Sequence, residues 1–274
     1  MKKLFKIGMA AVIGLTFVVS ACKKETKVED PAPASVDVPK QNKVLIMDIT
    51  GTWCPPCGSY GIPGFNQAIR LLGAKVLPLS VHSGDVLSNT IGDAIKNYKN
   101  YTSGSVPRFC VSSTKIFDGA YPDSNVTANK VAGFVDTAYF KPVVANSSMT
   151  NFKIVDNMMT FDLNTKFFTD VTGELSVGVY IIEDHIISSQ ALATGGSKAN
   201  QVHDHVLRGA ATPTWGLPLN EGATMAKSGT VVTQKIEYPV LTGWVASNLH
   251  FGMIIWNKVG GTYYFVNAAE FKQP

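Results

Sequence analysis

The sequence carries little excess charge, and this scarcity excludes one class of partner. Among its 274 residues, 24 are Lys or Arg and 20 are Asp or Glu, which gives a formal net charge of +4. Removal of residues 1–21, a predicted signal peptide, takes away three lysines and no acidic residue, so the net charge falls to +1. Nucleic-acid-binding domains are typically rich in clustered basic residues. We therefore expect no nucleic-acid partner.

Long hydrophobic segments are also scarce. The uncharged run from Ile7 to Val19 is too short to span a bilayer comfortably, but it has the length of the apolar part of a secretion signal. Lys2, Lys3 and Lys6 precede this run, as basic residues do in such signals. The protein is therefore predicted to be exported.

The end of this signal contains one of the few cysteines. The order Val19-Ser20-Ala21-Cys22 resembles a bacterial lipoprotein signal, in which the cysteine sulfur is alkylated by diacylglycerol and the chain is cut just before it. We expect residues 1–21 to be removed and Cys22 to carry a lipid anchor that holds the protein at a membrane. An ordinary signal peptide followed by a chance cysteine is the alternative.

Aromatic residues are absent from residues 22–42, which contain prolines and many charged side chains. Such a segment cannot bury enough apolar surface to fold, so we interpret it as the lipidated cysteine and a flexible tether. The 253 residues that remain after removal of the signal are more than one small domain usually needs. Two folded domains are expected.

The whole chain has only four cysteines, and two of them are three residues apart in Trp53-Cys54-Pro55-Pro56-Cys57. The apolar run Lys43–Ile49 before them is typical of a buried strand. Phe65, Ile69 and Leu72 after them recur at helical spacing. The pair is therefore predicted where a strand turns into a helix. The helix N-terminus lowers the pKa of the first cysteine, so Cys54 is the expected nucleophile and Cys57 the resolving thiol.

A Cys-x-x-Cys motif also occurs in c-type haem sites and in zinc sites. A c-type haem site needs histidine directly after the second cysteine, and Gly58 stands there. A zinc site needs two more ligands, and the nearest candidates are His203 and His205, whose side chains would point the same way on a strand. We expect no metal and no cofactor. A purely structural disulfide stays open, because an exported protein meets oxidising surroundings.

The segments that follow the pair alternate between strand and helix patterns. We expect a strand at Lys75–Val81, a helical insertion at Ser88–Tyr101, a strand pair opened by Pro107 and ending at Asp118, and a helix at Thr127–Phe140. Cys110 lies in that strand pair, where the simplest interpretation is a buried small apolar side chain.

This order of elements around Trp-Cys-x-x-Cys resembles the thioredoxin superfamily over residues 43–141. The resemblance implies that Val106–Pro107 is a cis peptide facing the disulfide, and that the partner's backbone lies along this edge. It also implies that Asp48, on the buried strand, takes the proton of the second cysteine, with a pKa raised by desolvation. The alternative places Asp48 at a cap or facing solvent.

The two prolines between the cysteines resemble the Cys-Pro-Pro-Cys of membrane-tethered thioredoxins that reduce cysteines outside the cytoplasm. Pro55 and Pro56 have no N–H group to offer the Cys54 thiolate, which favours a reducing couple. The resemblance places Pro55 and Pro56 in the substrate groove, together with Trp53 and Val106.

From residue 142 onward, alternating apolar and polar residues replace the helical stripes. The expected strands include Met159–Asn164, Leu175–Ile181, Val231–Tyr238, Leu249–Trp256 and Tyr263–Asn267, with Gly260-Gly261 joining the last two. Five or more antiparallel strands favour an all-β, immunoglobulin-like sandwich over residues 142–274. The fold class is therefore an α/β thioredoxin-like domain followed by a β-sandwich.

A lipoprotein signal, a thioredoxin unit and a β-sandwich containing His203-Asp204-His205-Val206-Leu207-Arg208 together resemble the twenty-eight-kilodalton outer-membrane-protein family of lipoproteins. Membership implies anchoring in the outer membrane, at its periplasmic face or at the cell surface. The expected function is thiol–disulfide exchange with protein thiols and disulfides of the cell envelope. A non-catalytic surface binding protein with a structural disulfide is the competing hypothesis.

Overall fold

The structure is a computed structural model that describes residues 36–102, 104–220 and 225–273. The predicted signal peptide, the lipidation site Cys22 and most of the predicted tether lie outside these residues. Within the described ranges, none of the helices combines the length and the apolar character needed to cross a membrane.

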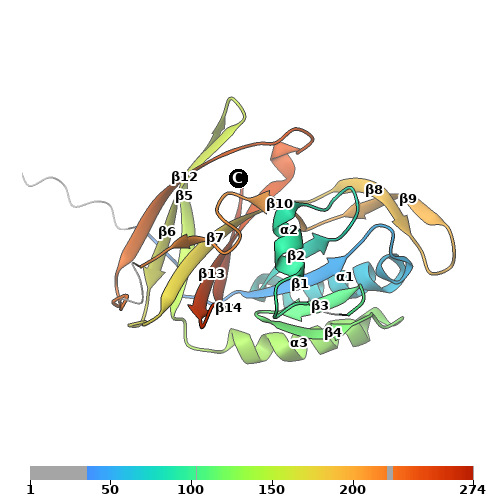
Figure 1. Ribbon diagram of the computed structural model, residues 1–274, viewed down its shortest axis with the longest axis horizontal. Coiled ribbons are helices and arrows are strands. Elements are labelled where there is room, and N and C mark those ends of the chain that lie inside the picture. The colour runs from blue at the N-terminus through green and yellow to red at the C-terminus, as the bar shows by residue number, and fades with distance from the viewer. Residues whose placement is uncertain (1–35, 103, 221–224, 274) are drawn as a thin grey trace, which may run out of the picture. The chain divides into compact units, whose positions relative to one another are not determined.

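One mixed sheet dominates the fold (Figure 1). Its strands follow the order β14-β13-β7-β10-β2-β1-β3-β4, and β11 pairs with β7 at the side. β1 and β2 run parallel, as do β2 and β10, whereas every other neighbouring pair in this order is antiparallel. The bounds of these strands are β1 Val44–Thr50, β2 Val76–His82, β3 Arg108–Val111, β4 Thr114–Asp118, β7 Glu174–Glu183, β10 Val206–Ala210, β11 Leu217–Pro218, β13 Leu249–Val259 and β14 Thr262–Lys272.

The strand before the cysteine pair is buried on both faces. Val44 and Ile46 of β1 belong to one hydrophobic core, and Leu45, Met47 and Ile49 belong to another on the opposite face. Such double burial explains why this strand is a continuous apolar run rather than an alternating one. Asp48 is the one acidic residue in the run.

Helices cover both faces of this part of the sheet. α1 (Ile62–Leu72) and α3 (Ser124–Tyr139) share the core that contains Val44 and Ile46, and α2 (Thr90–Lys96) contributes Ile95 to the opposite core. α1 and α3 approach closely at Gly64, where a Cβ atom would come within 2.6 Å of the Thr127 side chain. The parallel strands with helices confirm the α/β character predicted for this part of the chain.

The C-terminal part consists of antiparallel sheets. β5 (Ala145–Val155), β6 (Met158–Phe167) and β12 (Val231–Pro239) form a three-stranded sheet in the order β12-β6-β5. Its apolar side chains share one core with those of β7 and β13, so the two layers pack face to face. β8 (Ile186–Ala191) and β9 (Ser197–His203) form a separate two-stranded sheet.

The large sheet takes strands from both sides of residue 142. Val206 of β10 pairs with Ser80 of β2, and the Ser80 amide donates to the His205 carbonyl at 2.7 Å. β10 in turn pairs with β7, which brings the C-terminal strands into the same hydrogen-bonded sheet as β1. The division of the chain at residue 142 stays a prediction.

Most predicted elements are present with shifted ends. The helical insertion expected at Ser88–Tyr101 is helical over Thr90–Lys96 only, after a cap in which the Asn89 side chain accepts from the Gly92 amide. The expected strands of the C-terminal part correspond to β6, β7, β12, β13 and β14. β5, β8 and β11 were not predicted, and the residues interpreted as one polar strand and loop, Gln201–Gly209, divide between the end of β9 and the start of β10. Cys110 is buried in β3, as predicted, and burial raises the pKa of its thiol to about 12.

Candidate functional site

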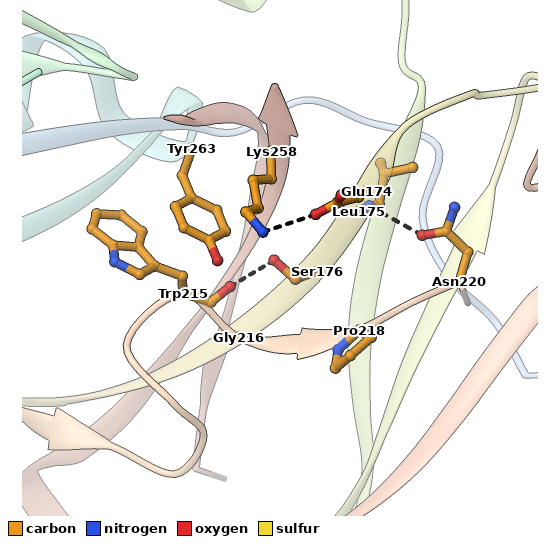
Figure 2. A pocket seen from close by; sticks show the side chains of 9 residues that line it. All are labelled: Glu174, Leu175, Ser176, Trp215, Gly216, Pro218, Asn220, Lys258 and Tyr263. Atoms are coloured by element: carbon orange, nitrogen blue, oxygen red, sulfur yellow. Dashed lines mark hydrogen bonds and ion pairs between the residues drawn. The ribbon is translucent and has the colours of Figure 1, made fainter. Parts of the chain in front are cut away.

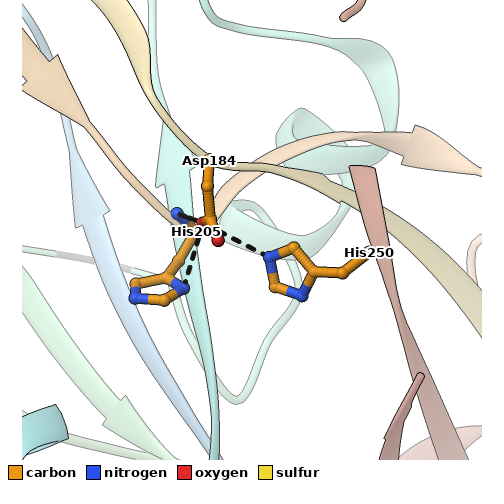
Figure 3. A group of neighbouring side chains, drawn as sticks. All are labelled: Asp184, His205 and His250. Carbon is orange, nitrogen blue, oxygen red and sulfur yellow. Dashed lines mark hydrogen bonds and ion pairs between the residues drawn. The ribbon is translucent and has the colours of Figure 1, made fainter. Parts of the chain in front are cut away.

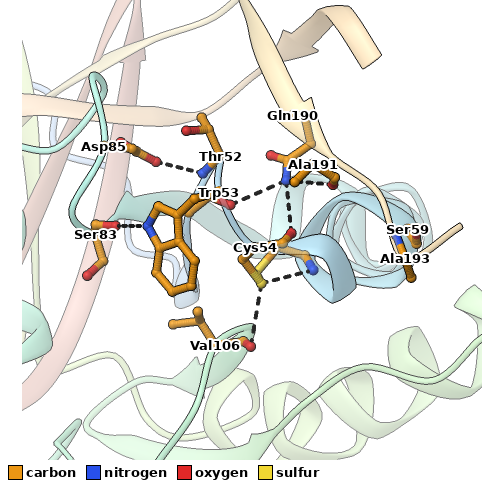
Figure 4. Close-up of a disulfide and its surroundings, with 12 residues drawn as sticks. Thr52, Trp53, Cys54, Ser59, Ser83, Asp85, Val106, Gln190, Ala191 and Ala193 are labelled. Atoms are coloured by element: carbon orange, nitrogen blue, oxygen red, sulfur yellow. Dashed lines mark hydrogen bonds between the residues drawn. A yellow bond between two sulfur atoms is a disulfide. The ribbon is translucent and has the colours of Figure 1, made fainter. Parts of the chain in front are cut away.

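The cysteine pair lies at the junction that the sequence predicts. Cys54 and Cys57 form a disulfide with an S–S distance of 2.09 Å, between the end of β1 and a π-helical turn, Cys57–Gly61, that leads into α1 (Figure 4). The Cys57 amide donates to the Cys54 sulfur at 3.1 Å. Because Pro55 and Pro56 have no N–H group, Cys57 supplies the first amide hydrogen after Cys54. A Cys54 thiolate would be stabilised by this donor.

The Val106–Pro107 peptide faces the pair and is cis, as the resemblance implied. The Cys54 sulfur lies 3.6 Å from the Val106 carbonyl oxygen. A Cβ atom on Gly61 would lie 3.0 Å from the Pro107 side chain, so this residue of the π-helical turn and the proline are in close contact. The loop before Pro107 is held by Arg108, whose guanidinium donates to the Tyr101 carbonyl at 2.6 Å.

Trp53 forms part of the open surface beside the disulfide. Its side chain is 54% exposed, and its indole N–H donates to the Ser83 carbonyl at 2.7 Å. With Val106, Lys96 and Arg108 it lines a hollow of about 480 Å³. Two of the four predicted groove residues therefore meet at one hollow. The other two, Pro55 and Pro56, are exposed but do not line it.

Asp48 is buried beneath α1, so the alternative of a capping or solvent-facing carboxyl is wrong. It is 1% exposed, and its Oδ1 has no hydrogen-bond partner among the described residues. Burial raises its pKa to about 7. Asp48 lines a small cavity of about 20 Å³ together with Thr50, Ser80, His82 and His203. That volume is enough for one water molecule.

A histidine and an aspartate next to this cavity hold the chain before Trp53. The imidazole of His82 lies 2.7 Å from Asp85, and the same Asp85 oxygen accepts from the Thr52 amide at 2.7 Å. Burial opposes ionisation of Asp85, but His82 and the amides of Thr52 and Leu87 together lower its pKa to about 2. Local sequence patterns do not predict this contact, because it depends on the conformation of the loop that follows β2.

The β8–β9 hairpin is the unexpected component of the site. Gln190 of β8 is fully buried, and its amide donates to the Cys54 carbonyl at 3.0 Å and to the Gly51 carbonyl at 3.3 Å (Figure 4). The Ala191 amide donates to the Thr52 carbonyl at 2.8 Å. The hairpin therefore closes one side of the segment that contains the disulfide.

Gly58 shows how tightly the hairpin fits. A Cβ atom at this position would lie 2.2 Å from the Ala191 carbonyl oxygen, far inside a normal contact. Gly58 was noted in the sequence only because it excludes a haem site. Its contact with Ala191 could not be predicted from sequence, because Ala191 is more than a hundred positions away.

Both sulfurs are well covered in the disulfide form. Cys54 is 2% exposed and Cys57 is fully buried. A partner thiolate therefore reaches Cys54 only if the residues around it move. The Val106 carbonyl lies against the Cys54 sulfur, and Gln190 of the β8–β9 hairpin holds the Cys54 carbonyl.

On one regular strand, the side chains of His203 and His205 would point to the same side. In the structure they point to different sites. His203 ends β9, and its ring packs edge-on against His82 at 5.3 Å. Burial, reinforced by the nearby His82, lowers the pKa of His203 to about 4. His205 has a left-handed backbone (φ 58°) that turns it toward Asp184 and His250. The irregular backbone between the strands separates the two side chains.

A second hollow, of about 260 Å³, lies on the C-terminal strands (Figure 2). Trp215 and Tyr263 stack on its wall with ring centroids 5.0 Å apart, and Lys258 pairs with Glu174 at 3.0 Å. Its lining contains no cysteine or histidine among the described residues. It therefore offers a binding surface that shares no residue with the surroundings of the disulfide.

Comparisons with known proteins identify a solved structure with a similar fold. No protein-family model matches the chain, and no curated protein sequence matches it. The solved structure of HBP35 of Porphyromonas gingivalis is similar over 85% of this chain and 76% of that one, with 18% identity and a TM-score of 0.66. A domain of the outer membrane lipoprotein Omp28 from Porphyromonas gingivalis aligns over 48% of this chain and 89% of its own, with 19% identity and a TM-score of 0.32. This chain shares its fold with HBP35.

Proposed function

We propose that the protein is a thiol–disulfide oxidoreductase of the cell envelope, with a thioredoxin-like N-terminal part and an immunoglobulin-like sandwich. The observation that carries the proposal is the arrangement around Cys54. Its sulfur accepts the Cys57 amide, faces the cis Val106–Pro107 peptide and lies at the end of the strand that contains a buried Asp48. Sites of exchange catalysts combine a stabilised thiolate with a nearby proton acceptor.

The first step is attack on a partner. In the reduced protein, the Cys54 thiolate attacks one sulfur of a partner's disulfide, and the other partner sulfur leaves as a thiolate that takes up a proton. A mixed disulfide between Cys54 and the partner results. The hollow beside Trp53 and Val106 offers room for the partner's chain, and the Val106 carbonyl is available to a backbone amide.

The second step releases the partner. Cys57 loses its proton and attacks the Cys54 sulfur, so the partner leaves with two thiols and the protein keeps the disulfide. Asp48 is the proposed acceptor of that proton, because a carboxyl with a pKa of about 7 exchanges protons near neutral pH. A dithiol reductant must regenerate the pair.

The location is proposed from the N-terminal sequence. Cleavage before Cys22 and lipidation of its sulfur would anchor the protein in the outer membrane, with the tether holding residues 43–274 away from the surface. The proposed partners are protein thiols and disulfides in the envelope.

One observation favours the competing function, a binding protein with a structural disulfide. Both sulfurs are buried, and the β8–β9 hairpin holds the segment between Gly51 and Cys54. In that case the disulfide fixes the start of α1, and recognition falls to other surfaces such as the hollow beside Trp215.

Replacement of the resolving cysteine separates the two functions. Cys57→Ser, incubated with a disulfide-bonded model protein such as insulin, should accumulate a covalent complex through Cys54 that a reductant dissolves. The matched control Cys54→Ser should form none. If Cys57→Ser forms no complex while its fold is retained by circular dichroism, the oxidoreductase proposal is wrong.

A further inference from the structure

Three side chains from distant parts of the chain converge near the ends of β7, β10 and β13. Asp184 follows the last residue of β7, His205 precedes β10, and His250 is the second residue of β13 (Figure 3). The Asp184 Oδ1 lies 3.3 Å from His205 Nδ1 and 3.3 Å from His250 Nε2. One donor atom from each residue lies within 4.8 Å of the others.

These separations fit metal coordination, and the His250–Asp184 contact is also a long hydrogen bond. Charge-assisted N–H···O bonds are about 2.7–2.9 Å long, so 3.3 Å is long for either pair. In a tetrahedral zinc site with bonds of about 2.0–2.1 Å, neighbouring ligand atoms are about 3.3 Å apart. His205 Nδ1 is buried and has no hydrogen-bond partner among the described residues.

The ligands are oriented by their surroundings. His250 directs its other ring nitrogen, Nδ1, at Glu270 Oε1, 3.1 Å away, and the second Glu270 oxygen pairs with Lys43 at 3.1 Å. A carboxylate behind a ligating histidine fixes the ring and raises its basicity. His205 is fixed through its backbone, because its amide donates to Asp184 at 2.7 Å and its carbonyl accepts from Ser80.

A second, similar Asp-His pair lacks the third ligand. Asp184-His185 and Asp204-His205 are related: each histidine has a left-handed backbone, and each donates its amide to the aspartate of the other pair. His185 is 73% exposed and lies 3.9 Å from Asp204. Among the described residues, only the set around His205 gains a third donor.

We propose that Asp184, His205 and His250 bind a divalent transition-metal cation of the zinc class. Two imidazoles and one carboxylate suit such ions better than Ca²⁺ or Mg²⁺, which prefer oxygen ligands. Asp184 and His205 are partly exposed, so the ion can enter from solvent. The fourth coordination position is left for water or a partner's side chain. This proposal is independent of the function of the cysteine pair.

The test is a titration of the full chain with Co²⁺ and then Zn²⁺, with Cys54 and Cys57 kept as the disulfide so that their thiolates cannot bind metal. We expect one equivalent of Co²⁺ to give visible bands of a tetrahedral site, which Zn²⁺ abolishes. A rise in melting temperature with added Zn²⁺ should accompany binding. His205→Gln, which removes a ligand, should lower the affinity for the metal ion at least about 100-fold. Glu270→Gln should lower it about 10-fold, because Glu270 contacts the ligand His250 and not the ion.

His185→Gln is the matched control and should bind as the unaltered chain does. The proposal is overturned if millimolar Co²⁺ and Zn²⁺ leave the spectrum and the melting temperature unchanged. In that case a protonated His250 bridging Asp184 and Glu270 accounts for the cluster. It is equally overturned if His205→Gln, shown by circular dichroism to be folded, binds as tightly as His185→Gln.

Discussion

Asp48 lies within a strand whose apolar side chains enter two hydrophobic cores. Ionisation of a carboxylate there leaves a charge without a hydrogen-bond partner on Oδ1, which explains the rise of its pKa to about 7. The residue therefore makes folding sensitive to pH in the range where the proposed proton transfer occurs.

The sign of that sensitivity follows from the direction of the shift. Asp48 is protonated more readily in the folded chain than in the unfolded one, whose carboxyl has a pKa of 3.8. Its contribution to stability is complete below pH 3.8 and is lost as the pH rises through about 7. We expect Asp48→Asn to be more stable than the unaltered chain at pH 9, by up to about 4 kcal/mol, and to gain little at pH 4.

Urea unfolding at pH 4, 7 and 9 measures this difference. Asp136→Asn on the exposed face of α3 is the control, and should show no such trend. An Asp48→Asn variant that is equally destabilised at every pH would contradict the assignment.

Several side chains of the candidate site could be predicted from sequence. The burial of Asp48 and the placement of the cysteine pair follow from an apolar run followed by a helical pattern. The contacts of His82 with Asp85 and of Gln190 with Cys54 could not, because each depends on loop or strand positions that the local pattern does not specify.

Among the elements, the β8–β9 hairpin has the greatest influence on the site. It contributes a buried Gln190 and a backbone amide at Ala191, and both bind the segment around Cys54. The hairpin was not predicted, because its strands pair only with each other and much of β9 is exposed. The alternation that reveals half-buried strands is therefore weak there.

Gly58→Ala tests the fit of this hairpin. The new Cβ would overlap the Ala191 carbonyl oxygen, so we expect the variant to lose about 1–3 kcal/mol of stability. The displaced hairpin should also let a small thiol reduce the disulfide faster. Thermal unfolding and the rate of reduction by dithiothreitol measure the two effects.

Gly133→Ala in α3 is a matched control. A Cβ there meets no atom within 4 Å, so the variant should gain about 0.5–1 kcal/mol from helix propensity and keep the original reduction rate. If Gly58→Ala behaves like Gly133→Ala, the hairpin does not restrict the disulfide.

At the scale of the whole molecule, the two halves of the chain share one core. Leu77 and Leu79 of β2 belong to the same hydrophobic cluster as Tyr180, Ile182 and Trp256, residues of β7 and β13. Val36–Pro274 forms one compact unit. Sequence patterns identified the change from helices to strands near residue 142, but periodicity contains no information about which strands of the second half pair with the first.

A fragment of residues 36–141 should therefore not fold alone. Loss of β7, β10 and β13 would leave β2 as an open edge and expose Leu77 and Leu79 to water. We expect the fragment to aggregate or to lack a cooperative urea transition. A soluble fragment with a cooperative transition by circular dichroism would show that the division predicted at residue 142 separates two independent domains.

The reduction potential of the Cys54–Cys57 pair tests the proposed function most directly. The full chain would be equilibrated in thiol buffers of known potential, alkylated and weighed. A value between about −270 and −120 mV, with Cys54 alkylated before Cys57 at acidic pH, is the result we predict, because it is the range of exchange catalysts. A value below about −300 mV, with neither thiol favoured, would identify a structural disulfide and contradict the proposal.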